Sequence, residues 1–179
     1  MSALALLERL ICTIAIISGL RTGEICALEW EHVGADFLNV QQRIYRGDLD
    51  SPKNSHSQRR AALSKDICSG LVTWGIFSPE AGSEVWVFPS ENSKTQLSRD
   101  NCWRRNIAPK LNALGLDWVN FQVMRRTHTS LMRELNVDPK VVAEQMGHTL
   151  DVDLNIYTEG SSARKPLTSS PQPWRPLTK

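Results

Sequence analysis

The apolar positions of the first thirty residues predict two helices. Leu4 to Leu20 carries apolar residues around much of the helical circumference, which is typical of a helix in the middle of a core. Gly19 interrupts this pattern just before Arg21, and Glu24 to Trp30 predicts a second, shorter helix. Arg21 therefore stands between two expected helices.

A looser alternation in the next segment predicts a small antiparallel sheet. Asp36 to Arg46 carries apolar residues at strand spacing, and Arg59 to Leu63 can return as a partner strand. Between them, Asp48 to Gln58 is polar and contains Pro52 and several serines, so we expect an extended turn there. Lys53 would lie at or near the tip of that turn.

Helical signals dominate the remainder of the chain. We expect a helix from Asp66 to Phe77, buried extended chain from Val85 to Phe88, and a helix that Ser98 or Asp100 caps and that runs to about Leu114, before Gly115. A helix from Val123 to Leu135 follows. Asp138-Pro139 starts a short helix from Lys140 to Met146, which Gly147 ends, and one or two helical turns run from Leu150 to Tyr157. Together these elements predict an α+β fold that is mainly α-helical.

Length and composition indicate one ordinary globular domain. The chain has 179 residues, of which 41% are hydrophobic and 22% charged. From Gly160 onward Ser, Pro, Arg and Lys prevail, so we expect a domain over residues 1–159 and a disordered or partner-docking tail over residues 160–179, with Trp174 as the candidate anchor. The apolar run Leu10 to Ile17 is too short to cross a bilayer.

The four cysteines argue against a structural zinc site, because Cys12, Cys26, Cys68 and Cys102 are far apart and form no C-x-x-C pair. Cys12 and Cys26 fall within apolar helical patterns and are expected to be buried, reduced thiols, which fits a cytosolic compartment.

Basic residues gather locally although the net charge is only +2. The clusters are Arg43, Arg46, Lys53, Arg59 and Arg60, and then Arg104, Arg105 and Lys110. Such clusters can neutralise phosphates even in a nearly neutral protein, while solvated basic faces would give the same pattern.

Four residues in separate local settings suit phosphoryl-transfer chemistry: Arg21, Arg125, His148 and Tyr157. Two guanidiniums can clamp a phosphate because each planar fork donates twice and keeps its charge. An imidazole can add a hydrogen bond, and a tyrosine can attack phosphorus. The alternatives are a surface salt bridge between Arg21 and Glu24, an ordinary polar histidine and a packing tyrosine.

These settings resemble the catalytic domain of the tyrosine recombinases, the phage-integrase family. The matching motifs are Gly19-Leu20-Arg21-Thr22-Gly23-Glu24, Arg125-Arg126-Thr127, Met146-Gly147-His148 and Asn155-Ile156-Tyr157. The resemblance covers roughly residues 4 to 158 and implies an integrase-type catalytic domain with its small antiparallel sheet on one side. It also implies that an N-terminal core-binding domain is absent, so that the chain is a fragment.

The resemblance implies site-specific DNA recombination or integration. Tyr157 would attack a DNA phosphodiester, form a 3′-phosphotyrosine link and release a 5′-hydroxyl. Lys53 would act on the leaving group, with Lys65 as its nearby competitor. Glu24 would orient Arg21 from behind.

No metal or cofactor is implied by the resemblance. The expected partners are double-stranded DNA and other integrase protomers, in a tetrameric synapse for the full-length protein. The expected DNA contacts are Arg43, Arg46, Arg59, Arg60, Arg104, Arg105 and Arg126. The expected location is the bacterial cytoplasm, at the nucleoid, for a bacterial or phage-encoded protein.

Three other interpretations compete with the recombinase. Type IB topoisomerase chemistry would use the same residues to relax supercoils. A decayed integrase relic would bind DNA without cutting it. An unrelated helical structural protein would require the four matched settings to be coincidental.

Gln122 departs from the family pattern, which usually has His three positions before the second arginine. An amide can donate to a phosphate oxygen but cannot accept a proton near pH 7. We therefore expect a competent but attenuated enzyme, in which Gln122→His raises the yield of covalent adduct on a nicked suicide DNA substrate. Equal yields would argue against attenuation, and no adduct from either protein would indicate an inactive domain.

Overall fold

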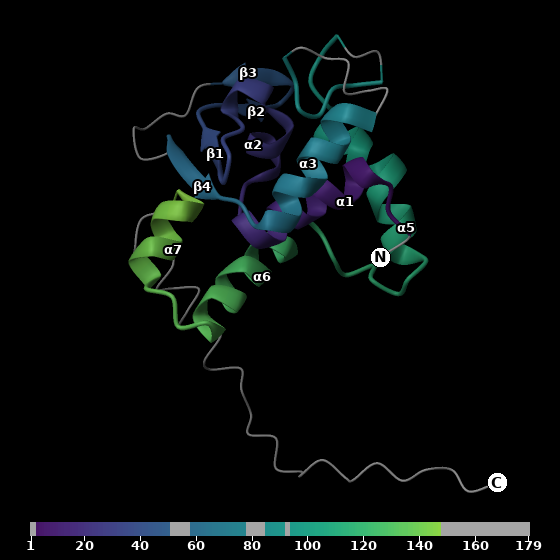
Figure 1. Ribbon diagram of the computed structural model, residues 1–179. Coiled ribbons are helices and arrows are strands. Elements are labelled where there is room, and N and C mark those ends of the chain that lie inside the picture. Colours follow the sequence, from purple (N-terminus) through teal and green to yellow (C-terminus); the bar gives the residue numbers. More distant parts are fainter. Residues whose placement is uncertain (1–2, 51–57, 78–84, 92–93, 148–179) are drawn as a thin grey trace, which may run out of the picture.

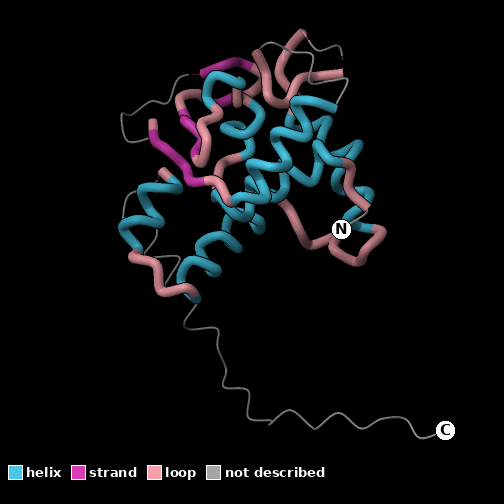
Figure 2. The backbone as a smooth tube through the Cα atoms, viewed as in Figure 1, coloured by secondary structure: helices cyan, strands magenta, loops and turns pink. Residues whose placement is uncertain are grey.

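The computed structural model describes residues 3–50, 58–77, 85–91 and 94–147. Helices make up most of this part of the chain, and two small antiparallel sheets lie together on one side of them (Figures 1 and 2). The mainly helical α+β fold is confirmed. Among the described residues, the helices are all too short or too polar to cross a membrane.

A long central helix forms the middle of the core. α1 (Leu6–Thr13) continues directly into a π-helical segment, η1 (Ile14–Ser18). α3 (Lys65–Phe77) packs along α1, and α6 (Phe121–Glu134) packs across η1. The helix predicted from the apolar pattern is therefore confirmed, and it is buried because apolar residues surround it.

The second helix is shorter than its sequence pattern predicted. α2 (Thr22–Cys26) ends four residues early, and a 3₁₀ turn, η2 (Trp30–His32), follows. The chain between them pairs with a distant extended segment: Trp30 N donates to Val85 O at 2.9 Å, and Val87 N donates to Leu28 O at 2.8 Å. A continued helix would need those backbone groups for itself.

Two antiparallel strand pairs replace the single expected sheet. β1 (Phe37–Val40) pairs with β4 (Arg59–Ala62), which confirms the predicted return strand. β2 (Arg43–Tyr45) pairs with β3 (Asp48–Asp50), so the prediction that a polar turn begins at Asp48 was wrong.

The missed hairpin has a local cause. Arg46 and Gly47 both have positive φ, 55° and 95°, which suits a tight two-residue hairpin turn. Across the pair, Arg43 Nη2 lies 2.8 Å from Asp50 Oδ2. The rest of the predicted turn, with Lys53, lies outside the described residues.

The later helices follow their capping signals. α4 (Arg99–Asn101), a π-helical segment η5 (Cys102–Ile107) and α5 (Ala108–Asn112) form one continuous run that starts at Ser98. α7 (Pro139–Met146) starts where Asp138 accepts a hydrogen bond from Lys140 N and ends at Gly147, as predicted. The predicted turns from Leu150 to Tyr157 and the tail after residue 160 lie outside the described residues.

Three of the cysteines lie in the core. Cys12, Cys26 and Cys102 are buried and free, which confirms the prediction made for the first two. Burial raises the pKa of Cys12 and of Cys26 to about 12 and that of Cys102 to about 11. These thiols are therefore protonated at neutral pH.

Gly19→Ala should destabilise the protein more than Gly115→Ala does. Both glycines have left-handed φ, 65° and 72°. A Cβ on Gly19 would lie 2.7 Å from Cδ2 of the buried His128, whereas a Cβ on Gly115 would meet no atom within 4 Å. In urea unfolding we expect a loss of about 3 kcal/mol for Gly19→Ala and about 1 kcal/mol for Gly115→Ala. Equal losses would show that the contact with His128 relaxes without cost.

Candidate functional site

Arg21 is held at a corner between two helices. Gly19 ends η1 in the left-handed conformation, and Arg21 is the extended residue that precedes α2, with φ −72° and ψ 146°. Its side chain keeps 39% of its surface exposed. The corner therefore presents a guanidinium that solvent, or a ligand, can reach.

The carboxylate of Glu24 lies between two arginines. Its Oε1 accepts from Arg21 Nη1 at 3.0 Å and from Arg59 Nη1 at 3.1 Å. Its Oε2 accepts from the backbone N–H of Arg21 and from Arg59 Nη2, both at 2.8 Å. The side chains of Glu24 and Arg59 are only 5% and 6% exposed. The structure thus places Arg59, expected as a DNA contact, inside the domain beneath Arg21.

This pairing decides the charge state of Glu24. Burial acts to raise the pKa of the carboxyl, because it disfavours the charged form. Hydrogen bonds and charge from Arg59, and then from Arg21, outweigh burial and hold the pKa below its ordinary value of 4.5. Glu24 is therefore an anion at neutral pH.

Arg125 reaches the same place from α6. Its Nη1 donates to the carbonyl of Gly19, and its Nη2 donates to the carbonyl of Met146 at 2.6 Å. Arg21 Nη1 lies 3.4 Å from that same Met146 oxygen. Two arginines that are distant in sequence therefore converge on one carbonyl group.

The end of α7 supplies the acceptors for this cluster. Gln145 O accepts from Arg59 Nε at 2.6 Å, and Gly147 O accepts from Arg21 Nη2 at 3.2 Å. The last carbonyls of a helix carry partial negative charge and favour nearby cations. We name Arg21, Glu24, Arg59 and Arg125, with the terminal carbonyls of α7, the arginine cluster. His148 follows Gly147 directly in the sequence.

Gln122 lies beside the cluster on the first turn of α6. It is exposed and stands one turn before Arg125 on the same helix. Asn120 caps this helix by accepting from Val123 N at 3.0 Å. A hollow of about 250 Å³ next to it is lined by Gln122 and Thr22, among others.

The hairpin β2–β3 carries a basic surface that the sequence predicted only in part. Tyr45 is 54% exposed, and Arg43 and Arg46 lie over its ring, 5.4 and 5.3 Å from the centroid. On β4, Arg60 lies 4.6 Å from the centroid of the Phe37 ring. The remaining DNA-contact candidates are all exposed: Arg104, Arg105 and Arg126. Tyr45 was missed because its setting becomes visible only once the hairpin forms.

Three predicted site residues, Lys53, His148 and Tyr157, lie outside the described residues. Lys65, the competitor of Lys53, is the first residue of α3 and is exposed.

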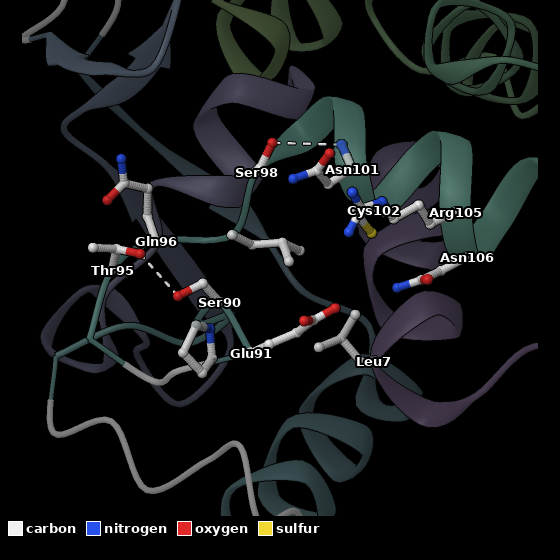
Figure 3. A pocket seen from close by; sticks show the side chains of 12 residues that line it. Leu7, Ser90, Glu91, Thr95, Gln96, Ser98, Asn101, Cys102, Arg105 and Asn106 are labelled. Atoms are coloured by element: carbon white, nitrogen blue, oxygen red, sulfur yellow. Dashed lines mark hydrogen bonds between the residues drawn. The ribbon is translucent and has the colours of Figure 1, made fainter.

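A larger hollow, of about 430 Å³, lies elsewhere on the molecule (Figure 3). It is lined by residues 89–91 and 95–98, by Leu7, and by the end of α4 and the adjoining η5. Arg105 and Asn106 reach it from η5, and Ser90 and Thr95 bond to each other across one edge at 2.8 Å. Among the described residues, no member of the arginine cluster lines this hollow, so the hollow is not the candidate site.

A possible metal-binding trio within the described residues fits a hydrogen-bonded arrangement better than a metal. The ligand atoms of Glu29, Glu31 and His32 lie within 4.8 Å of one another. His32 Nδ1, however, accepts a hydrogen bond from Glu29 N, which leaves the proton of a neutral ring on Nε2. That nitrogen faces Glu31 Oε1 at 3.5 Å. A metal ligand would need the lone pair that the proton occupies.

Comparisons with known proteins show what the whole chain is similar to. A model described as the Phage integrase family matches residues 2–164. The ICEBs1 integrase of Bacillus subtilis (strain 168) is 26% identical over 168 residues, which is 85% of this chain and 46% of that protein. The integrase of Staphylococcus phage L54a is 25% identical over 162 residues, 79% of this chain and 45% of that protein. The chain thus spans about half the length of these curated relatives.

Solved structures share the fold. The Tn1549 transposon integrase in complex with transposon right end DNA matches with a TM-score of 0.69 and 14% identity, over 87% of this chain and 56% of that one. The XerA recombinase matches with a TM-score of 0.67 and 15% identity, over 90% of this chain and 57% of that one.

Glu24→Gln should destabilise the protein in a pH-dependent way. At pH 7 we expect a loss of about 3 kcal/mol in the free energy of unfolding, because the change leaves a buried guanidinium without its anion. The lowered pKa means that the stabilisation by Glu24 is fully present above the ordinary value of 4.5 and is lost as pH falls through the lowered pKa. Urea unfolding between pH 7 and 3 should show wild type and variant converging at the acid end.

The control is Asp117→Asn at an exposed position, which should change stability by less than about 0.5 kcal/mol throughout. A constant gap between wild type and Glu24→Gln down to pH 3 would contradict the assignment of the charged form.

Proposed function

The chain belongs to the phage integrase family, and from this we propose that it is the catalytic domain of a site-specific DNA recombinase. The observation that supports the proposal is the convergence of Arg21 and Arg125 on the carbonyl of Met146. Guanidiniums that meet at one acceptor can also meet at one phosphate.

Arg21 and Arg125 bind the non-bridging oxygens of the scissile phosphate in this proposal. Charge on those oxygens grows as the transition state forms, and forks already held by the protein stabilise it without reorganisation. Glu24 fixes Arg21 through both its backbone and its side chain. His148, next after the α7 terminus, adds a further hydrogen bond.

Tyr157 is the proposed nucleophile. Its phenolic oxygen forms a bond to phosphorus as the bond to the 5′-oxygen breaks, which leaves a 3′-phosphotyrosine. Lys53 gives a proton to the departing 5′-oxygen. A 5′-hydroxyl from a partner strand then reverses the steps, so the bond energy is conserved and the strands are exchanged.

Gln122 leaves the proton of Tyr157 without the usual acceptor. An amide beside Arg125 can donate to a phosphate oxygen, but water or His148 must take the proton. This arrangement is the source of the attenuation expected above.

DNA is the proposed substrate, and other protomers are the proposed partners. The Tn1549 integrase was solved with transposon DNA, and a lambda integrase dimer was solved on a COC′ core site. In this chain the exposed arginines would contact the DNA backbone, in salt-sensitive fashion. Four protomers in one synapse would complete the exchange.

A DNA-binding relic remains the second candidate, and Gln122 is the residue that favours it. Failure of wild type and of Gln122→His to form an adduct would support the relic. Religation of nicked plasmid without strand exchange would instead favour topoisomerase chemistry.

Arg125→Lys should slow formation of the covalent adduct by about 10²-fold or more, because a lysine lacks the second donor of the fork. DNA affinity should change little, since exposed arginines carry the backbone contacts. The matched control is Arg126→Lys on the next, exposed position of α6, which should leave cleavage near the wild-type rate. Tyr157→Phe sets the zero level of adduct. Near-normal cleavage by Arg125→Lys would refute its role.

A further inference from the structure

Arg59 makes a buried, two-pronged ion pair with Glu24, yet the chemistry above gives it no part. Its two terminal nitrogens face the two oxygens of Glu24, at 3.1 and 2.8 Å, in a fork-to-fork arrangement. Its side chain is 6% exposed, so a DNA phosphate cannot reach it directly. Its effect on a substrate must therefore pass through another residue.

The charges around Glu24 show which residue that is. Glu24 and Arg21 alone would form a neutral pair, and much of the positive charge that Arg21 could offer to a phosphate would be cancelled. With Arg59 present, the three side chains carry one uncompensated positive charge. Arg21 is 39% exposed while Arg59 and Glu24 are buried, so the face that a ligand meets is that of Arg21.

We propose that Arg59 is a positioning residue that takes up the negative charge of Glu24 and so keeps Arg21 cationic toward the scissile phosphate. This inference rests on the proposed function, because it assigns Arg59 a role in the same phosphate clamp. It goes beyond the motif residues, which include Glu24 but not Arg59.

A second contact ties the same guanidinium to the end of α7. Arg59 Nε donates to Gln145 O at 2.6 Å, one residue before the carbonyl that Arg21 and Arg125 share. A Cβ on Gly147 would lie 2.9 Å from Arg59 Nη1, so the guanidinium occupies space that only a glycine leaves open. Arg59 thus sets the position of the acceptors as well as the charge of Glu24.

Arg60 provides a matched control on the same strand. It is exposed and lies over the Phe37 ring, on the opposite side of β4 from its neighbour. If the basic strand acted only by attracting DNA, Arg60→Gln would weaken cleavage as much as Arg59→Gln. A role through Glu24 requires the two variants to differ.

The experiment compares Arg59→Gln, Arg60→Gln and the double variant Glu24→Gln/Arg59→Gln in single-turnover cleavage of a nicked suicide DNA duplex. Arg59→Gln should cleave about 10²-fold more slowly than wild type, with an unchanged Kd for the uncleaved duplex. The double variant should recover at least about tenfold, because it removes the carboxylate that would otherwise neutralise Arg21. Arg60→Gln removes an expected contact with the DNA backbone, so it should weaken the Kd, and it should slow cleavage far less than Arg59→Gln does.

A double variant no faster than Arg59→Gln would overturn the inference, because a residue that serves folding alone gains nothing from a second buried change. Arg59→Lys keeps the charge without the fork, so it should cleave faster than Arg59→Gln. If Arg59→Gln fails to fold, Arg59→Lys provides the test. The inference would then be overturned if Arg59→Lys cleaved as slowly as Arg21→Gln.

A titration of the Glu24 carboxyl by ¹³C NMR separates this inference from the proposed function, because it needs no cleavage. The charged groups that face Glu24 are Arg21 before α2 and Arg59 on β4, and Arg125 on α6 shares an acceptor with Arg21. In Arg59→Lys and Arg59→Gln the Glu24 pKa should rise, by about one unit or more in the glutamine variant. An unchanged pKa would overturn the inference even in an active enzyme. A raised Glu24 pKa in the Arg59 variants, together with a wild-type chain that forms no adduct, would support the charge arrangement while refuting recombination.

Discussion

The buried carboxylate of Glu24 is the interaction on which the rest of the site depends. A lone carboxylate at this depth would be strongly disfavoured, and it is tolerated because arginines from both sides saturate its two oxygens. One of these arginines immediately precedes α2 and the other lies on β4, so satisfying a single anion fixes a helix against a strand. The same guanidiniums reach on to the end of α7. The arginines that balance the charge of Glu24 are therefore the same residues that hold α2, β4 and the end of α7 together.

Placing three guanidiniums close together creates the opposite difficulty, since cations repel each other. Two kinds of negative charge offset this repulsion: one full anion in the interior, and the partial charges of the carbonyl groups that a helix leaves unsatisfied at its C-terminus. Gly147 matters here because its left-handed conformation ends α7 and leaves those carbonyls to the arginines. The Glu24 carboxylate and the α7 carbonyls are fixed parts of the protein, and they offset the repulsion between the guanidiniums. The cluster can therefore accept an anion without first rearranging.

Local signals in the sequence were enough for much of the fold. The central helix, α6, and α7 with its aspartate cap and terminal glycine all follow from periodicity and capping, which are properties of neighbouring residues. The helix expected to reach Trp30 was wrong because its backbone groups pair with Val87 and Val85, a partner that no local pattern reveals. Arg59 and Arg60 look alike in sequence, and only the pleat of β4 turns one inward. Grouping Arg21 with Arg125 needed a family resemblance, because spacing alone does not bring distant segments together, and the roles of Lys53, His148 and Tyr157 stay predictions.

The hydrogen bonds that close the arginine cluster span as many as 126 positions of the chain. A ribosome makes the guanidiniums first and the carbonyls of α7 after them. A nascent chain that has folded its central helix and both strand pairs holds Arg21 and Arg59 without the α7 carbonyls that their guanidiniums will contact. Under the proposed function, the arginines would therefore be ready for a phosphate only once α7 has emerged and docked, and a partly made domain would lack the complete cluster.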